Sequence, residues 1–152
     1  MCGRQSPTRS SSAPSPRSPA LAARFFVDEN DLALGKALDA THGDVVYPGH
    51  PSLGEIPRGT LDDDWLPVVG RRRLVVITRD RRIRYRPAEK RAWVDHKVRG
   101  FVLTGKKSQS TLASKTILDR HWPAIETLVR DEPDGPWMRA VTEPAITPVP
   151  LV

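Results

Sequence analysis

Three short acidic clusters contain the residues of this sequence that are best suited to chemistry. Asp28 and Glu29 follow the apolar run Phe25–Val27, Asp62–Asp64 is an uninterrupted triplet, and Asp80 ends a second apolar run. Converging carboxylates repel one another and are costly to hold together without a cation. Oxygen ligands, with no cysteine cluster and no histidine pair, suit Mg²⁺ or Mn²⁺ better than zinc. The sequence therefore predicts a site for a hard metal ion.

The stretch Leu74–Asp80 organises the fold that we expect. Its apolar residues run without alternation, which is typical of a parallel strand covered by helices on both faces. Phe25–Val27 repeats this pattern ahead of Asp28, and ligands of such sheets bind beyond the carboxyl ends of the strands. Asp28 and Asp80 are thus predicted to share one edge of the sheet. The acidic triplet has an alternative interpretation, because the helix dipole favours acids in the first turn of a helix.

The remaining segments alternate between strand and helix patterns, which predicts the α/β class. The expected order is a strand at 24–28, a helix that stops at Gly43, a strand at 45–47, a Pro/Gly-rich loop at 48–60, a helix at 61–70, a strand at 73–77, a helix at 88–96, a strand at 98–103, a helix from about 110, another helical segment from Pro123 and an edge strand at 137–141. Residues 1–23 and 143–152 are expected to be disordered tails, since they are rich in Pro or in Ser, Pro and Arg. One domain, 24–142, remains.

Charge is distributed unevenly along the 152 residues, whose net charge is +6. Nine acidic and two basic residues lie between Asp28 and Asp64, whereas twelve basic and three acidic residues lie between Arg71 and Arg99. An acidic pocket beside a basic surface suits a metal-dependent enzyme that acts on a polyanion, although solvated charged faces would also explain the arginines. The single cysteine, Cys2, excludes an internal disulfide and is compatible with the cytoplasm. No apolar run reaches the roughly 20 residues of a membrane span.

Four motifs in this order resemble PIN-like domains. They are Phe26-Val27-Asp28-Glu29-Asn30, Gly43-Asp44-Val45-Val46, Asp62 with Trp65–Leu66, and Val76-Ile77-Thr78-Arg79-Asp80. The resemblance covers roughly residues 24–142 and is to the short branch related to VapC ribonuclease toxins and Mut7-C nucleases. It implies a three-layer α/β/α sandwich around a mostly parallel sheet of four to five strands. It also implies metal-dependent cleavage of RNA.

The resemblance assigns roles residue by residue. The implied catalytic residues are Asp28, Asp62 and Asp80. These three are also the implied ligands of Mg²⁺ or Mn²⁺, and Thr78 falls on the family's hydroxyl position near the metal. We further expect Glu29 or Asp63 to orient the attacking water or to bind a second ion, with Asn30 near the site. The arginines expected to neutralise RNA phosphates are Arg79, Arg81, Arg82 and Arg84. Larger PIN domains supply a further acid from a helix that precedes the Asp62 position, and here only Glu55 is available.

Three functions are compatible with these patterns. The first is an endoribonuclease, the toxin of a VapBC-type toxin–antitoxin pair, with RNA, a cognate antitoxin protein and a second copy in a homodimer as partners. The second is a catalytically idle PIN-like module that binds RNA or protein, which the missing further acid favours. The third is a flavodoxin-like phosphoacceptor, which also uses acids at strand ends and a later lysine such as Lys106. The helix-opening Asp62 and the dense arginines fit this third function poorly.

Overall fold

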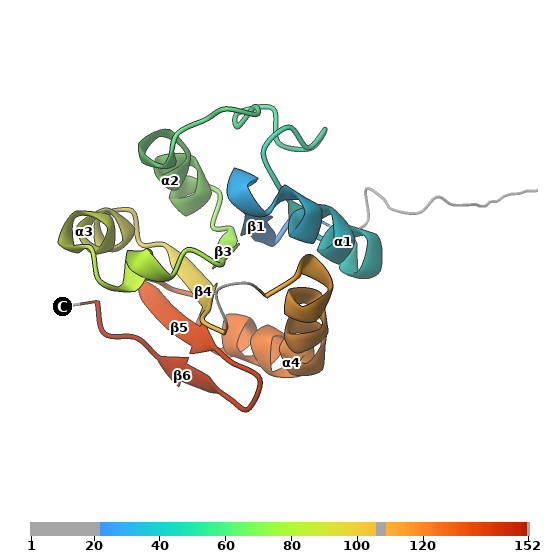
Figure 1. Cartoon of the computed structure of the whole chain (residues 1–152). Coiled ribbons are helices and arrows are strands. Elements are labelled where there is room, and N and C mark those ends of the chain that lie inside the picture. The colour runs from blue at the N-terminus through green and yellow to red at the C-terminus, as the bar shows by residue number, and fades with distance from the viewer. Residues whose placement is uncertain (1–21, 106–108, 152) are drawn as a thin grey trace, which may run out of the picture.

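The computed structural model describes residues 22–105 and 109–151 (Figure 1). Residues 1–21, most of the expected amino-terminal tail, and Lys106 lie outside the described residues. The elements in chain order are β1 (Phe25–Val27), the 3-10 helix η2 (Glu29–Asp31), α1 (Leu32–His42), β2 (Val45–Val46), α2 (Asp62–Arg71), β3 (Val75–Thr78), the 3-10 helix η3 (Arg81–Arg84), α3 (Pro87–Asp95), β4 (Arg99–Leu103), α4 (Thr111–Asp131), β5 (Trp137–Val141) and β6 (Ile146–Pro148).

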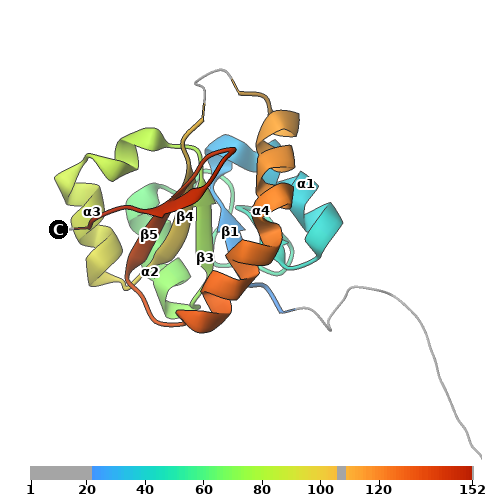
Figure 2. The same ribbon diagram turned by 90° about the horizontal axis from the view of Figure 1, so that it is seen from below.

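The strands form one sheet in the order β2-β1-β3-β4-β5-β6. The first five are parallel, and β6 runs antiparallel to β5. Helices α1 and α4 cover one face and α2 and α3 cover the other, as Figures 1 and 2 show. The α/β class, the three layers and the mostly parallel sheet are therefore confirmed. The sheet has one strand more than the four to five expected.

Each central strand sends alternate side chains into two separate cores. Phe25 and Val27 pack with α1 and α4, whereas Phe26, between them, packs with α2. In β3, Ile77 belongs to the first core and Val76 to the second. A strand buried on both faces needs apolar residues at every position. This requirement explains why both runs lack alternation and why they were recognisable as central strands.

Local signals in the sequence set several helix boundaries as expected. Gly43 ends α1 in the left-handed conformation, with φ 82°, and its amide donates to the carbonyl of Asp39. Glycine adopts this conformation without the steric cost of a Cβ atom. Pro87 opens α3, where its missing amide has no helical partner to lose. The hydroxyl of Ser110 caps α4 by accepting from the amide of Ala113 at 3.0 Å.

The carboxyl-terminal segment differs from the expected disordered tail. Ile146–Pro148 forms β6, and a turn in which the Thr142 amide donates to the Ala145 carbonyl brings it back along β5. Val149 and Leu151 then pack against the α2/α3 core. Proline content suggested disorder, but proline is tolerated in an edge strand, where an amide can be missing from the ladder. The prediction for 143–152 is therefore wrong over β6, and β5 is not an edge strand.

The helix expected to start at Pro123 is instead the second half of α4, which runs unbroken from Thr111 to Asp131. An internal proline costs one helical hydrogen bond. The buried residues Ile117, Leu118, Trp122 and Ile125 continue one apolar face through this point. Their packing in the α1/α4 core outweighs the local preference for a break. No helix in the described part of the chain is long and apolar enough to cross a membrane.

Gly100 in β4 permits a close contact, and replacing it tests the packing of the α2/α3 face. A Cβ atom there would lie 2.7 Å from both the Trp93 ring and the Val76 carbonyl oxygen. We expect Gly100→Ala to lower the free energy of unfolding by about 1–3 kcal/mol through overpacking. Gly54→Ala is the matched control, because no atom lies within 4 Å of its added Cβ. Urea denaturation measures both, and equal losses would contradict this account.

Candidate active site

An acidic cleft of about 580 Å³ opens at the carboxyl end of the sheet, where the segment after β1 faces the start of α2. The acids that line it are Asp28, Glu29, Asp62, Asp63 and Glu89, with Asn30 among them. The fold thus brings together most of the residues predicted for the site. Glu89, from the first turn of α3, was not predicted.

Asp28 is the most deeply buried carboxylate of this cleft, with 6% of its surface exposed. Its Oδ2 accepts a hydrogen bond from Thr78 Oγ1 at 3.3 Å, whereas its Oδ1 has no hydrogen-bond partner. Burial raises the pKa of Asp28 from its ordinary 3.8 to about 7, and the nearby carboxylates of Asp31 and Asp62 contribute to the rise. A buried carboxylate oxygen without a donor is an energetic cost that a bound cation would relieve.

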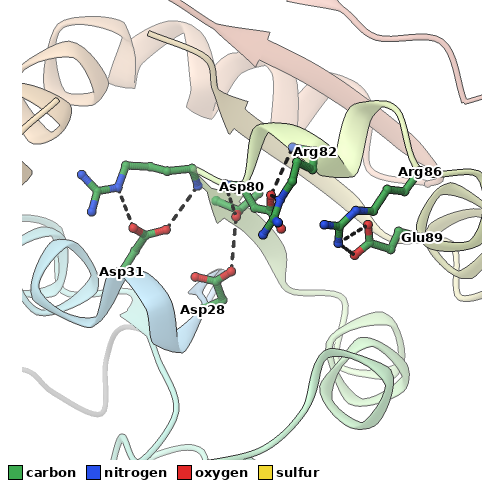
Figure 3. Close-up of polar contacts among 8 residues, drawn as sticks. Asp28, Asp31, Asp80, Arg82, Arg86 and Glu89 are labelled. Atoms are coloured by element: carbon green, nitrogen blue, oxygen red, sulfur yellow. Dashed lines mark hydrogen bonds and ion pairs between the residues drawn. The ribbon is translucent and has the colours of Figure 1, made fainter. Parts of the chain in front are cut away.

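Asp80 is joined to Asp28 through the hydroxyl of Thr78. The amide of Asp80 donates to Thr78 Oγ1 at 3.0 Å, while the same hydroxyl donates to Asp28. The carboxylate of Asp80 accepts from the amide and from Nε of Arg82, at 3.1 and 3.3 Å, and so caps η3 (Figure 3). Asp80 is not among the described residues that line the cleft. The predicted neighbourhood of Thr78 and the two acids is present, but Asp80 is engaged by an arginine.

Asp62 lies at the first position of α2, as predicted. Its Oδ1 accepts from Trp65 Nε1 at 2.9 Å, an interaction that fixes the side chain on the cleft. Asp62 and Asp28 line the same cleft, and the charge of Asp62 contributes to the raised pKa of Asp28. Asp63 also lines the cleft, whereas Asp64 does not. The triplet is therefore both a favourable helix start and a contributor of two acids to the cleft.

Asp31 is a functional neighbour that the sequence analysis missed. It is buried, and its two oxygens accept from Nε and from the backbone amide of Arg79, at 2.5 and 3.2 Å. Figure 3 shows Asp31 beside Asp28. The only sequence signal was its spacing of three residues from Asp28, and nothing local indicated its pairing with the end of β3. The ion pair places a positive charge next to the acidic cleft.

The same contacts hold Arg79 within the fold, and its binding of RNA stays a prediction. Its guanidinium pairs with Asp31 and also donates to the Gln109 carbonyl and to Ser114 Oγ, both at 3.2 Å. These partners come from η2 and from the start of α4, so Arg79 ties three segments together. Most donors of the Arg79 side chain are therefore engaged within the protein, because β3 ends directly against η2.

The other predicted arginines have different environments. Arg82 is paired with Asp80, yet 72% of its side chain remains exposed. The guanidinium of Arg84 lies 4.8 Å from the centre of the exposed Tyr85 ring. The side chain of Arg81 lies outside the part of the chain that the structure describes. RNA binding by Arg81, Arg82 and Arg84 stays a prediction.

Three further acids are already engaged by cations or amides. Glu29 accepts from the Gly59 amide and lies 3.6 Å from Arg58 Nε. Both oxygens of Glu89 accept from Arg86 Nη1 at 3.3 Å, as Figure 3 shows. Glu55, the acid considered from the loop at 48–60, pairs with Arg72 at 2.7 Å and is not a lining residue of the cleft. Glu89 therefore replaces Glu55 as the additional acid of this site.

The described side chains around the cleft have the oxygen ligands that a hard cation prefers, but they do not converge on one metal position. Within residues 22–105 and 109–151, no group of three or more His, Cys, Asp or Glu side chains is placed to hold a metal ion. The donors around the cleft are carboxylate and amide oxygens, and Asp28 Oδ1 is buried and unpaired. Such oxygens are the ligands preferred by Mg²⁺ and Mn²⁺. That Asp28, Asp62 and Asp80 share one ion stays a prediction.

Comparisons with known proteins agree with the architecture of this site. A family model described as PIN like domain matches residues 23–105, which extend from β1 to the end of β4 and include every residue of the cleft. Neither the curated proteins nor the solved structures gave a match to the chain.

The burial of Asp28 predicts a distinctive dependence of stability on pH. The folded protein keeps this proton to a pH near 7, whereas the unfolded chain releases it near pH 3.8. The free energy of unfolding should therefore fall as pH rises from about 4 to 7, by at most about 4 kcal/mol. Asp28→Asn should remove this decline, so that the variant matches the wild type near pH 4 and is more stable than it near pH 8.

Urea denaturation in metal-free buffer across this range measures the effect. Asp63→Asn is the control, because this exposed acid lines the same cleft and should leave the decline intact. If Asp28→Asn is less stable than the wild type near pH 8, the ionised carboxylate makes structural bonds that outweigh its burial.

Proposed function

The chain belongs to the PIN-like domain family, and on this basis we propose that it is a metal-dependent endoribonuclease that hydrolyses RNA phosphodiester bonds. The observation that carries the proposal is the buried, unpaired Oδ1 of Asp28 in a cleft lined by further acids. An acid held in this state is poorly suited to a purely structural role, because burial raises its pKa and the hydrogen bond from Thr78 compensates this only in part.

Asp28, Asp62 and Asp80 are the residues proposed to hold the metal ion, with Glu29 and Asp63 at the edge of the site. A bound Mg²⁺ or Mn²⁺ would polarise the phosphodiester and lower the pKa of an attacking water. Asp28 would hold the cation as a carboxylate and would release its proton to solvent, because metal ligands act in their deprotonated form. Thr78 holds Asp28 and the Asp80 backbone in a fixed relation through its hydroxyl.

Arg79 and Asp31 act together as positioning residues in this proposal. Their ion pair fixes the end of β3 against η2, which carries the segment that follows Asp28. Because Asp31 is neutralised by Arg79, it adds less negative charge to the cleft than an unpaired carboxylate would.

Arg82 and Arg84 are the proposed contacts to the RNA backbone. Arg82 is exposed beside Asp80, and it is free to exchange its weak contact at 3.3 Å for a phosphate oxygen. Tyr85 presents an exposed aromatic ring next to these arginines, and an unpaired base can stack on such a ring. These features favour single-stranded RNA as the substrate class. They carry no information about sequence.

The finer role proposed is that of the toxin in a VapBC-type pair, with a cognate antitoxin protein as partner. A specific observation favours a second candidate function, a catalytically idle PIN-like module that binds RNA. The carboxylate of Asp80 is held by Arg82, and no three acids of the described residues converge on one point. In this second function the cleft would bind nucleic acid or protein without hydrolysis.

Cleavage of RNA by the purified chain separates these two functions. We expect Mg²⁺- or Mn²⁺-dependent cleavage that stops when the metal is chelated. Asp28→Asn should lower the rate by at least about 100-fold, which is about 2.7 kcal/mol in the barrier. Asp64→Asn removes an equal charge from the same region without altering the cleft, so it should cleave at close to the wild-type rate. Binding of RNA without any cleavage would support the idle module.

The contrast between Arg79 and Arg82 tests which arginines contact RNA. Arg82→Ala should weaken RNA binding and reduce the slope of log affinity against log salt by about one unit, with little change in stability. Arg79→Ala should instead lower the free energy of unfolding by about 3 kcal/mol, because it leaves Asp31 buried and unpaired. Binding titrations at several salt concentrations and urea denaturation measure the two effects. An unchanged salt slope in Arg82→Ala would exclude a phosphate contact there.

A further inference from the structure

A second cavity, of about 500 Å³, lies at the end of the sheet opposite the acidic cleft. It is bordered by the turn between α2 and β3, the turn between α3 and β4, and the segment that leads into β5. The permanent cations of its lining are Arg71, Arg73, Lys97 and Arg99. Two acids, Asp95 and Asp134, oppose them. The lining therefore carries an excess of positive charge.

Arg99, the first residue of β4, is the unusual member of this lining because only 7% of its surface is exposed. Its stem passes against Gly135, where an added Cβ would lie 3.1 Å from Arg99 Cγ. Its Nη2 donates to the backbone carbonyl of Arg73, the one hydrogen bond that its five donors make within the described residues. None of its nitrogens is both buried and without a partner, so the remaining donors are open to the cavity that Arg99 lines. No carboxylate of the described residues lies within 4.0 Å of the Arg99 guanidinium.

A buried guanidinium without a counter-charge is costly, because the energy of its lost hydration is not returned by an ion pair. Burial lowers the pKa of Arg99, repulsion from Arg73 lowers it further, and Asp134 opposes these effects. Asp134 itself is 85% exposed and pairs with Arg73 at 3.2 Å. The nearest acid is thus exposed to solvent and already shared, so Arg99 is left undercompensated.

Arg73 stands at the rim of the same cavity. Its Nη2 donates to the Pro133 carbonyl at 2.7 Å, which fixes its guanidinium toward the segment before β5. Arg73 and Lys97 both have positive φ, 57° and 54°, a conformation that costs non-glycine residues about 1–2 kcal/mol each. Strain of this kind persists only where the surrounding structure demands it. Here the left-handed residues end α2 and α3 in Schellman turns, in which the amides of Leu74 and Val98 donate to the carbonyls of Val69 and Trp93. Both turns border the cavity, so Arg73 and Lys97 lie at its opening.

We propose that this cavity binds a phosphate-sized oxyanion, either free phosphate or the phosphate group of a small nucleotide, with Arg99 at its base and Arg73 at its rim. The anion supplies the counter-charge that Arg99 lacks, and the planar guanidinium suits two parallel bonds to phosphate oxygens. A divalent anion matches the charge excess better than a single carboxylate. The volume exceeds that of phosphate alone, which leaves room for an attached nucleoside.

This site does not depend on the proposed nuclease activity. It lies beyond the amino ends of β3 and β4, whereas the acidic cleft lies beyond the carboxyl ends of β1 and β3. Its test is a binding measurement that needs neither metal nor RNA cleavage, so failure of one proposal leaves the other intact.

Thermal unfolding of the wild type with inorganic phosphate is the first test, with chloride at equal ionic strength as the reference anion. We expect a saturable rise in Tm of about 3 °C or more, because a ligand that binds only the folded state stabilises it by mass action. Adenosine monophosphate and adenosine form two further arms. If the site binds a nucleotide, adenosine monophosphate should raise Tm at roughly tenfold lower concentration than phosphate does. If the site binds free phosphate, adenosine monophosphate should raise Tm equally or less. Adenosine alone should have no effect in either case.

Arg99→Met keeps the stem and removes the charge, so it should abolish the response to phosphate while leaving Tm without phosphate equal or higher. Arg73→Gln should weaken phosphate binding by about tenfold in calorimetric titrations. Arg120→Met is the matched control, since Arg120 is exposed on α4, pairs with Glu143 and keeps clear of the cavity. The proposal is overturned if phosphate stabilises the wild type no more than chloride does, or if Arg99→Met keeps the full response. Should Arg99→Met fail to fold, an unchanged affinity in Arg73→Gln overturns it equally.

Discussion

Removal of the Asp28 carboxylate from water is the constraint around which this end of the molecule is arranged. The carboxylate sits at the end of a strand covered on both faces, so it has lost its hydration and regains only one hydrogen bond, from Thr78. Desolvation and the neighbouring acids both oppose its ionised form. Asp31 beside it adds to this cost, although Asp31 is itself paired with Arg79. The folded protein is therefore destabilised at pH values at which Asp28 is ionised.

The sequence predicts those parts of the fold in which a residue pattern is compatible with only one structural environment. Unbroken apolar runs can satisfy only a strand that is buried on both sides, and Gly43 suits the left-handed end of α1. Where local preference and packing disagree, packing prevails. Pro123 lies within a continuous helix because its neighbours fill the α1/α4 core, and β6 forms beside β5 despite its prolines. The unbroken helix depends on α1, which is distant in sequence, and β6 is supported by the packing of Val149 and Leu151 against the α2/α3 core.

The residues of the acidic site also differ in how well the sequence predicts them. Asp28 follows β1, Thr78 ends β3 and Asp62 opens α2, which are local signals in the sequence. The parallel pairing of β1 with β3 brings Asp28 and Thr78 together, and α2 adds Asp62 to the cleft. Asp31 and Glu89 have no comparable local signature. Their place in the site follows from the pairing of Asp31 with Arg79 across β3 and from the approach of α3 to the cleft. The arginines were the least predictable, because a basic run does not reveal which side chain will be taken by a partner.

The two borders of the sheet restrict how this protein can associate. β6 has three residues and ends at Pro148, which has no amide to offer, and β2 has only two residues. Edge strands this short, or interrupted by proline, are poor templates for a strand from another chain. Another chain is therefore not expected to add a strand to either edge of this sheet. The same feature reduces edge-to-edge aggregation during folding, because parallel sheets fold slowly. A second copy or a regulatory protein would have to dock on the helical layers or on the loops, through side chains.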